Sequence, residues 1–235
     1  MLSYCGNDLR GRIPESITGL SQLTNLYLCY NRLTGGIPES ITNLTKLTNL
    51  DLSTNKLSGS IPHFISNMSY FTALSLGDNA FTGSLSEAIG HLSTLMELNL
   101  NSNSLVGKIP ESIAGLSQLQ LLYLDSNSLT GSLPQAISNL TNLVVLFLHN
   151  NNFTGTIQAI GNLTRPIQAT IQLQVHLSGN NFNGAIPESF CELNWLGSLD
   201  FSENRLERSI PQCFGNLQFL SILALSNNLL SGVLP

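Results

Sequence analysis

The chain has 235 residues, of which 42% are hydrophobic and only 10% charged, and its formal net charge is −5. An average soluble domain is about 25% charged, so uncharged polar side chains must form most of the polar surface that this chain exposes to water. The acidic balance, with no run of Lys or Arg, argues against binding nucleic acid or an anionic membrane surface. The hydrophobic fraction is too high for a disordered chain.

No stretch approaches 18 consecutive apolar residues, so we predict no membrane segment in this chain. The first residues lack a basic region followed by an apolar one, so no signal peptide is predicted there. We therefore expect either an intracellular protein or an internal piece of a longer one.

One asparagine recurs in register along the whole chain, with a spacing of 24 residues and a single gap of 29. The repeated positions are Asn7, Asn31, Asn55, Asn79, Asn103, Asn127, Asn151, Asn180, Asn204 and Asn228. Most follow a Leu-x-Leu pair, which is typical of a short strand with one buried face. A buried Asn amide can bond backbone groups of adjacent turns. Together these features indicate leucine-rich repeats that stack into a solenoid.

The predicted repeats run through the chain in order, as one solenoid over residues 1–235 with a half repeat at each end. The eight complete copies begin at Leu20, Leu44, Met68, Leu92, Leu116, Leu140, Leu163 and Leu193. An irregular seam near 157–175 contains the extra residues of the longer gap. Its alternating apolar residues, Ile167 to Leu177, favour a strand longer than the others.

After the Asn, segments such as LTGGIP, LSGSIP and LVGKIP resemble the plant-type leucine-rich repeat of receptor-like kinases, receptor-like proteins and polygalacturonase inhibitors. The resemblance implies an α/β fold: a right-handed solenoid with a parallel β-sheet on its concave face, and 3₁₀ or short helical turns on its convex face. Members of this family usually end in cysteine-paired caps, and the sequence shows no such cluster at either end. We therefore expect the caps to be absent.

The cysteines of this chain are Cys5, Cys29, Cys191 and Cys213. Cys29 is predicted on the outward side of a strand. Cys191 and Cys213 are 22 residues apart, nearly one repeat, so they can approach each other. A disulfide and two unpaired buried cysteines both remain open for this pair.

Five Asn-x-Ser/Thr sequons indicate a secreted or cell-surface location, which the family resemblance also implies. They begin at Asn43, Asn67, Asn139, Asn152 and Asn162. Most lie on the return side of the repeat, which leaves the concave face free of sugar. The Asn-Leu-Thr junction also belongs to the repeat pattern, so sequons can arise there without selection for glycans.

The outward positions of the predicted strands gather aromatic side chains with a polar rim, as binding sites do. The predicted ligand-binding residues are Glu97, Asn99, Leu121, Tyr123, Asp125, Val145, Phe147, His149 and His176. The alternative is that these cross-strand aromatic pairs only stabilise the sheet. The expected partner is a peptide, glycan or protein ligand, and the resemblance adds a co-receptor or a secreted pectinase.

Two rows of small hydroxyl side chains support a different function, that of an ice-binding protein. The first row contains Thr34, Ser58, Thr82, Thr130, Thr154 and Ser231, and the second contains Ser60, Ser84, Ser132, Thr156 and Ser209. Val106, Lys108, Glu207 and Arg208 interrupt the rows. An enzyme is not expected, because no nucleophile, base and orienting group come together in a known motif. No cofactor is predicted, and His149 with His176 makes only a weak metal site.

Overall fold

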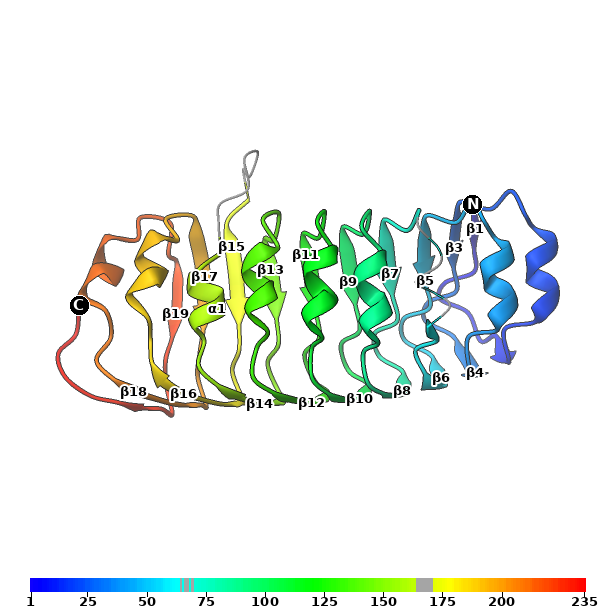
Figure 1. The fold of residues 1–235 in the computed structure, drawn as a ribbon. Helices are drawn as coiled ribbons and strands as arrows, with labels where there is room; N and C mark the ends of the chain where they lie inside the picture. The colour runs from blue at the N-terminus through cyan, green and yellow to red at the C-terminus, as the bar shows by residue number, and fades with distance from the viewer. Residues whose placement is uncertain (64, 66–67, 69, 164–170) are drawn as a thin grey trace.

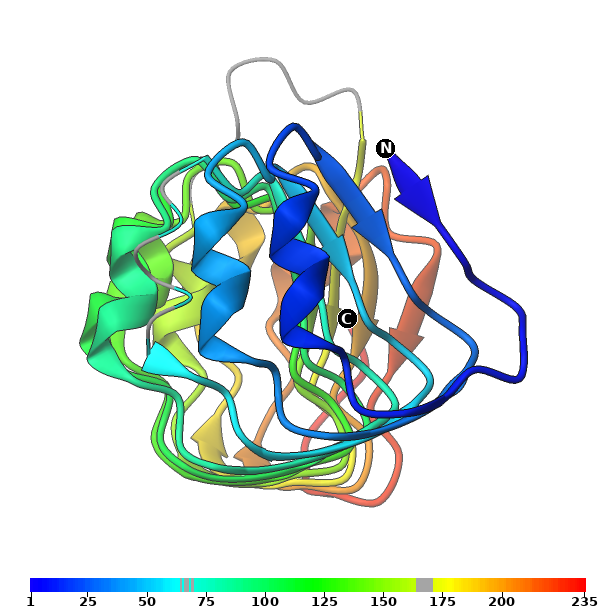
Figure 2. The ribbon, with the colours of Figure 1, turned by 90° about the vertical axis from the view of Figure 1, so that its right-hand side faces the viewer.

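The computed structural model describes residues 1–63, 65, 68, 70–163 and 171–235. The repeats lie side by side along one axis and form an elongated coil (Figure 1). A typical repeat contributes two short strands and one helical turn. Viewed from its N-terminal end, the coil has the first strands and the helical turns on opposite sides, with the second strands along the edge between them (Figure 2).

The first strands form a ten-stranded sheet in which neighbours are parallel and follow chain order. The outer surface of this sheet is the concave face. Its strands are β1 (Leu2–Ser3), β3 (Asn25–Tyr27), β5 (Asn49–Asp51), β7 (Ala73–Ser75), β9 (Glu97–Asn99), β11 (Leu121–Tyr123), β13 (Val145–Phe147), β15 (Leu173–His176), β17 (Leu196–Asp200) and β19 (Ile222–Ala224).

The second strands form another ten-stranded parallel sheet along the edge of the coil. Its strands are β2 (Arg10–Gly11), β4 (Arg32–Gly35), β6 (Lys56–Ser60), β8 (Ala80–Gly83), β10 (Ser104–Gly107), β12 (Ser128–Gly131), β14 (Asn152–Gly155), β16 (Asn181–Ala185), β18 (Arg205–Arg208) and β20 (Leu229–Leu230). In each typical strand one apolar residue is buried, such as Leu129 in β12, and its neighbours Ser128 and Thr130 are exposed.

The helical turns cover the convex side of the coil. They are η1 (Glu15–Gly19), η2 (Glu39–Asn43), η4 (Glu87–His91), η5 (Glu111–Gly115), η6 (Gln135–Asn139), α1 (Gln158–Gly161), η7 (Glu188–Glu192) and η8 (Gln212–Asn216). Most follow a proline, whose fixed φ suits the extended residue before the turn. In η2, the Ile41 N–H donates to the Pro38 carbonyl at 3.0 Å, and the Ile41 side chain is fully buried.

The recurring asparagines bind successive repeats together, as the sequence predicts. Asn55 donates from Nδ2 to the carbonyls of Leu52 and Ser53 in its own repeat, at 3.1 and 3.2 Å, and to that of Leu28 in the preceding one, at 3.0 Å. Its Oδ1 accepts from the Leu33 N–H at 2.9 Å. An Asp could not donate to these carbonyls, so the position requires the amide.

The seam differs from the sequence prediction. Strand β15 begins only at Leu173, and the predicted residues from Ile167 to Thr170 lie outside the described part of the chain. Ile171 is 58% exposed and does not share the buried face of Leu173 and Val175. The pairing of β15 with β17 shifts register between Leu173 and Gln174, because Gly197 of β17 lies between their partners Leu196 and Ser198.

Two disulfides join neighbouring repeats. Cys191 and Cys213 are paired between η7 and η8, which settles the alternative left open by their spacing. Cys5 is paired with Cys29, and the sequence analysis did not predict this pair. Cys29 is buried under it, although its strand position predicts an outward side chain. Among the described residues, no helix is long and apolar enough to cross a lipid bilayer.

Candidate functional site

Three rings lie in one line across adjacent strands of the concave face, and we call them the aromatic row: Tyr123, Phe147 and His176. The strand register pairs Tyr123 with Phe147 and Phe147 with His176. The Tyr123 and Phe147 rings meet edge to face, with centroids 5.4 Å apart. Phe147 and His176 are stacked with centroids 4.3 Å apart. The row is thus a continuous aromatic surface fixed by the sheet.

Polar groups hold the imidazoles beside this row. Nε2 of His176 lies 2.9 Å from the Ser198 hydroxyl oxygen, on the neighbouring strand β17. Nε2 of His149 lies 3.4 Å from Oδ2 of Asp125, an ion pair when His149 is protonated. The His149 ring also packs edge to face against Phe147, with centroids 5.9 Å apart. The imidazoles therefore have fixed positions at the site.

Burial changes the ionisation of the groups around the row. Burial and the nearby charge of Asp51 raise the pKa of Glu97. Burial also raises the pKa of Asp125, and this effect outweighs the opposing charge of His149. The pKa of His176 is lowered, chiefly because burial penalises the imidazolium. These groups are only partly solvated, so a ligand that contacts them displaces little water.

The structure brings the predicted ligand-binding residues together but does not expose them equally. Most are half-buried: Glu97, Asn99, Leu121, Tyr123, Phe147, His149 and His176. Val145 and Asp125 are each only 7% exposed. Val145 pairs with Leu121 on one side and Gln174 on the other, and His149 lies against Asp125. We therefore expect Val145 to support the site from below, and a ligand role for the whole set stays a prediction.

Two further residues contact the site and were not selected from the sequence. Ser198 holds His176, and Asp200 pairs with His176 in the strand register. Asp200 accepts a hydrogen bond from the backbone N–H of Ser202 at 3.0 Å, and hydrogen bonds of this kind lower its pKa despite partial burial. Their place in the same outward columns of the repeat was the signal that could have identified them.

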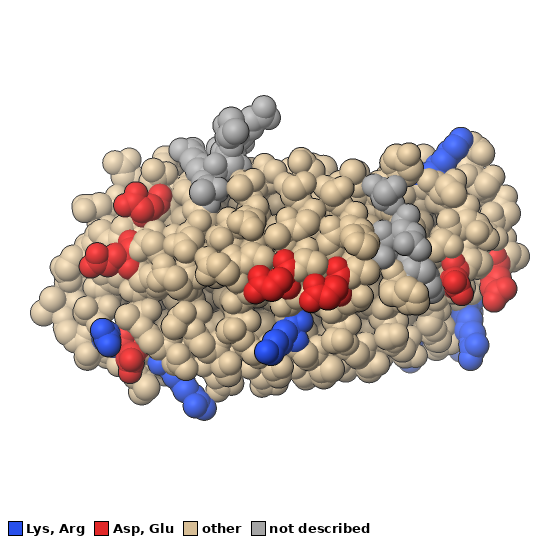
Figure 3. Space-filling view, viewed as in Figure 1, with Lys and Arg blue, Asp and Glu red and all other residues tan. Residues whose placement is uncertain are grey.

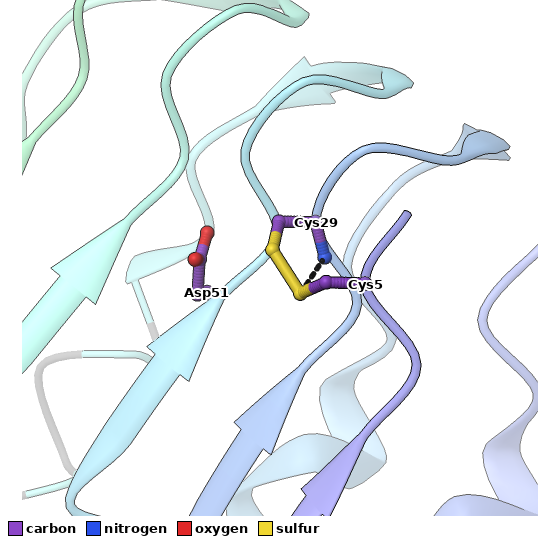
Figure 4. A group of neighbouring side chains, drawn as sticks. All are labelled: Cys5, Cys29 and Asp51. Atoms are coloured by element: carbon purple, nitrogen blue, oxygen red, sulfur yellow. Dashed lines mark hydrogen bonds between the residues drawn. A yellow bond between two sulfur atoms is a disulfide. The ribbon is translucent and has the colours of Figure 1, made fainter. Parts of the chain in front are cut away.

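One grouping of metal-ligating residue types occurs in the described part of the chain: Cys5, Cys29 and Asp51. Figure 4 shows that the two sulfur atoms are bonded to each other and that the Cys29 N–H donates to Sγ of Cys5, at 3.1 Å. Disulfide sulfurs are not the thiolates that bind metal ions. This grouping therefore stabilises the N-terminal repeats and offers no metal centre.

Four of the predicted sequon asparagines have exposed side chains: Asn43, Asn139, Asn152 and Asn162. Asn67 lies outside the described residues. Asn43 and Asn139 end the turns η2 and η6, and Asn162 follows α1, so all three lie on the convex side. Asn152 begins β14 of the second sheet. None of these four lies on the concave face.

The hydroxyl rows lie on the outer face of the second sheet. Thr82, Thr130 and Thr154 are exposed on β8, β12 and β14. In the same row, Val106 is exposed on β10 and interrupts the hydroxyls. Neighbouring strands in a sheet are about 4.8 Å apart, so the rows present hydroxyls at a regular spacing on either side of this break.

Two parallel sheets, short helical turns and a ladder of recurring asparagines that bind successive repeats together define a leucine-rich repeat solenoid. Comparison with family models agrees: the model described as "Leucine-rich repeat region" matches residues 73–209, and that described as "Leucine rich repeat" matches residues 2–57 and 21–81. The chain belongs to the leucine-rich repeat family, and its repeats are of the plant type. A comparison with curated protein sequences finds no match.

Several solved structures are similar over the whole chain. A TDR receptor is 33% identical over 99% of this chain, with a TM-score of 0.94. The Arabidopsis receptor kinase HAESA, in complex with the peptide hormone IDA and the co-receptor SERK1, is 32% identical over 100%, with a TM-score of 0.90. The chain spans 40% and 38% of these two receptor chains. A plant ice-binding protein is 27% identical over 100% of this chain and 74% of its own, with a TM-score of 0.87.

Proposed function

We propose that this chain is a noncatalytic extracellular recognition module that binds a peptide, glycan or protein ligand on its concave face. The observation that carries the proposal is the aromatic row of Tyr123, Phe147 and His176. It is partly solvent-accessible, continuous across β11, β13 and β15, and bordered by polar groups. The likeness to a receptor solved with a peptide hormone supports a peptide as the first ligand class to test.

Recognition by this face requires little ordering of the protein. Each ring of the row belongs to a strand that is hydrogen-bonded to both neighbouring strands, and His176 also forms a hydrogen bond with Ser198. A preorganised aromatic surface loses little conformational entropy when a ligand binds, so more of the contact energy appears as affinity. Aromatic rings in a partly desolvated patch are also the side chains that most often dominate binding energy.

An extracellular location is supported by two independent features. Both cysteine pairs form disulfides, which persist in oxidising compartments. The exposed sequon asparagines lie away from the concave face, so glycans there would leave the aromatic row accessible. A co-receptor or a secreted pectinase as partner belongs to the same proposal, because either would cover part of this face.

The test is a capture experiment with the glycosylated chain. The wild-type protein is immobilised and exposed to secreted peptides, cell-wall oligosaccharides and pectinases, in parallel with the Tyr123→Ser/Phe147→Ser double variant. We expect a retained ligand that the double variant fails to hold. Thr82→Ser on the second sheet is the matched control. Equal capture by the double variant would place binding away from the aromatic row.

Ice binding is a second candidate, and the hydroxyl row on the second sheet favours it. Thr82, Thr130 and Thr154 are exposed along one face, and a plant ice-binding protein is similar over the whole chain. Regularly spaced hydroxyls can order surface water. Val106 on β10 and Lys108 just after β10 break the regularity between Thr82 and Thr130, which makes this the weaker candidate.

The two candidates separate in one measurement. Ice-crystal shaping is followed with the wild-type chain and with Thr130→Lys/Thr154→Lys, which puts charge on the row. Under the ice-binding candidate the wild type shapes ice and the lysine variant does not. Under the recognition proposal neither protein shapes ice, and the lysine variant keeps the ligand captured by the wild type.

A further inference from the structure

Charge is unevenly distributed between the two sheets. The strands of the first sheet and the turns after them carry the carboxylates of Asp51, Asp78, Glu97, Asp125, Asp200 and Glu203, and among their described residues they carry no Lys or Arg. Most of the described Lys and Arg residues lie on strands of the second sheet: Arg10, Arg32, Lys56, Arg205 and Arg208. On the helical side, several Lys and Arg side chains lie toward the second-sheet edge (Figure 3).

The carboxylates surround the aromatic row. Glu97 pairs in the strand register with Leu121, two residues before Tyr123, and Asp125 follows Tyr123 by two residues. Burial is the main cause of the raised pKa of Tyr123, and the charges of Glu97 and Asp125 raise it further, so both carboxylates lie near the Tyr123 side chain. At the other end of the row, Asp200 pairs with His176. The row therefore lies between negative groups at both ends.

Among the described residues of the site, only imidazoles oppose these charges. His149 lies 3.4 Å from Asp125, and its charge lowers the pKa of that carboxyl, but burial still has the larger effect. Burial favours the neutral form of His176. Burial and the like charge of Asp51 raise the pKa of Glu97. The free site therefore has an excess of negative charge that a positively charged ligand group would offset.

We propose that the concave site selects a cationic peptide, with an Arg or Lys side chain placed over the Tyr123 ring between Glu97 and Asp125. The inference rests on the proposed function and names the chemistry of its ligand. A guanidinium or ammonium group on an aromatic face gains about 0.5–2 kcal/mol from the ring quadrupole. Hydrogen bonds from the same group to a carboxylate are charge-assisted and stronger than neutral ones.

The same distribution of charge also guides the approach of the ligand. A face lined by one sign of charge raises the local concentration of oppositely charged partners and speeds association. The effect weakens as salt screens the charges over about 10 Å at 0.1 M. Capture of a basic peptide by the wild-type chain should therefore be faster at low salt, whereas an acidic peptide should be repelled.

The test uses an array of random dodecapeptides made in matched pairs, in which each Arg of one member is replaced by neutral citrulline in the other. We expect Arg members to bind wild-type protein about tenfold more tightly than their partners, which corresponds to about 1.4 kcal/mol. Glu97→Gln/Asp125→Asn should bring this ratio close to one. Glu39→Gln/Glu207→Gln, which removes two exposed charges elsewhere, should leave it unchanged.

The outcomes separate this inference from the function on which it rests. Peptides that bind equally with Arg or citrulline, and are lost in Tyr123→Ser/Phe147→Ser, would overturn the cationic preference and leave recognition by the aromatic row standing. A ratio that persists in Glu97→Gln/Asp125→Asn would also overturn it. Binding of no peptide at all would overturn the cationic-peptide inference, whereas the proposed function is overturned only if the capture experiment also retains no glycan or protein. The wild-type ratio decides the matter even if the double variant folds poorly.

Discussion

The imidazole of His176 lies parallel to the phenyl ring of Phe147, with 4.3 Å between the ring centroids and 5° between the planes. The two residues face each other across β13 and β15, and Ser198 contacts the imidazole at Nε2. Because burial lowers the pKa of His176 below 6.5, the ring is mostly neutral at pH 7. A neutral imidazole extends the aromatic row by one strand.

Phe147→Ala tests how this stack controls the imidazole. Removal of the phenyl ring lets water reach His176, so the pKa of His176 should rise toward 6.5. The measurement is an NMR titration of the His176 ring protons in wild type and variant. The ring protons of His91, exposed on the convex side, serve as the internal control, and their signals should be unchanged by the substitution. A fall in the His176 pKa would contradict the assignment of burial as the main cause.

Glu97 makes the stability of the chain depend on pH. Its pKa is raised above 4.5 by burial and by Asp51, so the native state keeps a proton that the unfolded chain has lost. Its contribution is present below pH 4.5 and is lost as the pH rises through the folded pKa. Glu97→Gln should therefore gain stability relative to wild type between about pH 4 and pH 7. Urea midpoints across this range measure the gain, and Glu207→Gln, at an exposed side chain of β18, serves as the control substitution.

Asn127 represents the asparagine ladder at the middle of the chain. It donates to the carbonyls of Leu100, Leu124 and Asp125 at 3.0–3.2 Å and accepts from the Leu105 N–H at 2.9 Å. Asn127→Ala removes the acceptor of the Leu105 N–H and one donor from each carbonyl, although Asn103, Asn151 and the Ser102 N–H still donate to these carbonyls. We expect a loss of about 2 kcal/mol in the free energy of unfolding. Urea denaturation followed by circular dichroism measures the loss.

Two further variants test whether the loss of stability comes from the hydrogen bonds of the asparagine ladder or from the removal of any side-chain amide. Asn127→Asp keeps the acceptor and loses the donors, so it should be at least as unstable as Asn127→Ala at pH 7. Asn216→Ala, at the exposed end of η8, should change the midpoint by less than about 0.5 kcal/mol. A small effect of Asn127→Asp would show that donation to the carbonyls is not what stabilises the repeats.

Repetition made most of the fold predictable. A 24-residue period places equivalent residues on adjacent strands, so Leu50 and Leu74 pair in the structure as their shared position in the repeat predicts. For the same reason, each recurring Asn after Asn7 donates to a carbonyl of the preceding repeat. The aromatic row could be predicted because Tyr123 and Phe147 occupy one outward column, although the sequence did not show that the next ring, His176, stacks so closely.

The features that could not be predicted depend on packing against neighbouring residues, which an alternating pattern of apolar and polar residues does not describe. Alternation gives the direction of a side chain but not what covers it, and so Val145 and Asp125 are buried although they point outward. At the seam, β15 begins only at Leu173, and its pairing with β17 shifts register between Leu173 and Gln174, which a simple alternation does not predict. The pairing of Cys5 with Cys29 depends on close approach at the first repeat, which the cysteine count did not reveal.

Arg208 occupies a position where the repeat normally has glycine. Its φ is +68°, and glycines such as Gly131 and Gly155 adopt the same left-handed region at the end of their second strands. For a residue with a Cβ, the left-handed backbone conformation costs about 1–2 kcal/mol of conformational energy. Arg208→Gly should therefore raise the free energy of unfolding by about 1 kcal/mol, although glycine is more flexible when unfolded. Thermal and urea unfolding measure the change.

The reverse substitution provides the control. Gly155 has φ +78°, and a Cβ there would lie 3.2 Å from Cβ of Ser132. Gly155→Ala should lower stability, because it adds both backbone strain and a tight contact. Stabilisation by Gly155→Ala, or destabilisation by Arg208→Gly, would contradict the strain assigned to this position of the repeat.

A glycan placed on the concave face tests the proposed binding surface most directly. Asn101→Thr creates an Asn-Leu-Thr sequon at Asn99, whose strand position pairs with Tyr123. Asn99→Gln/Asn101→Thr carries nearly the same change without the sugar. Binding of the ligand captured by the wild type is measured for both variants after mass spectrometry confirms the glycan. We predict that the glycosylated variant loses binding and that the matched variant keeps it. Full binding by the glycosylated variant would contradict recognition on the concave face.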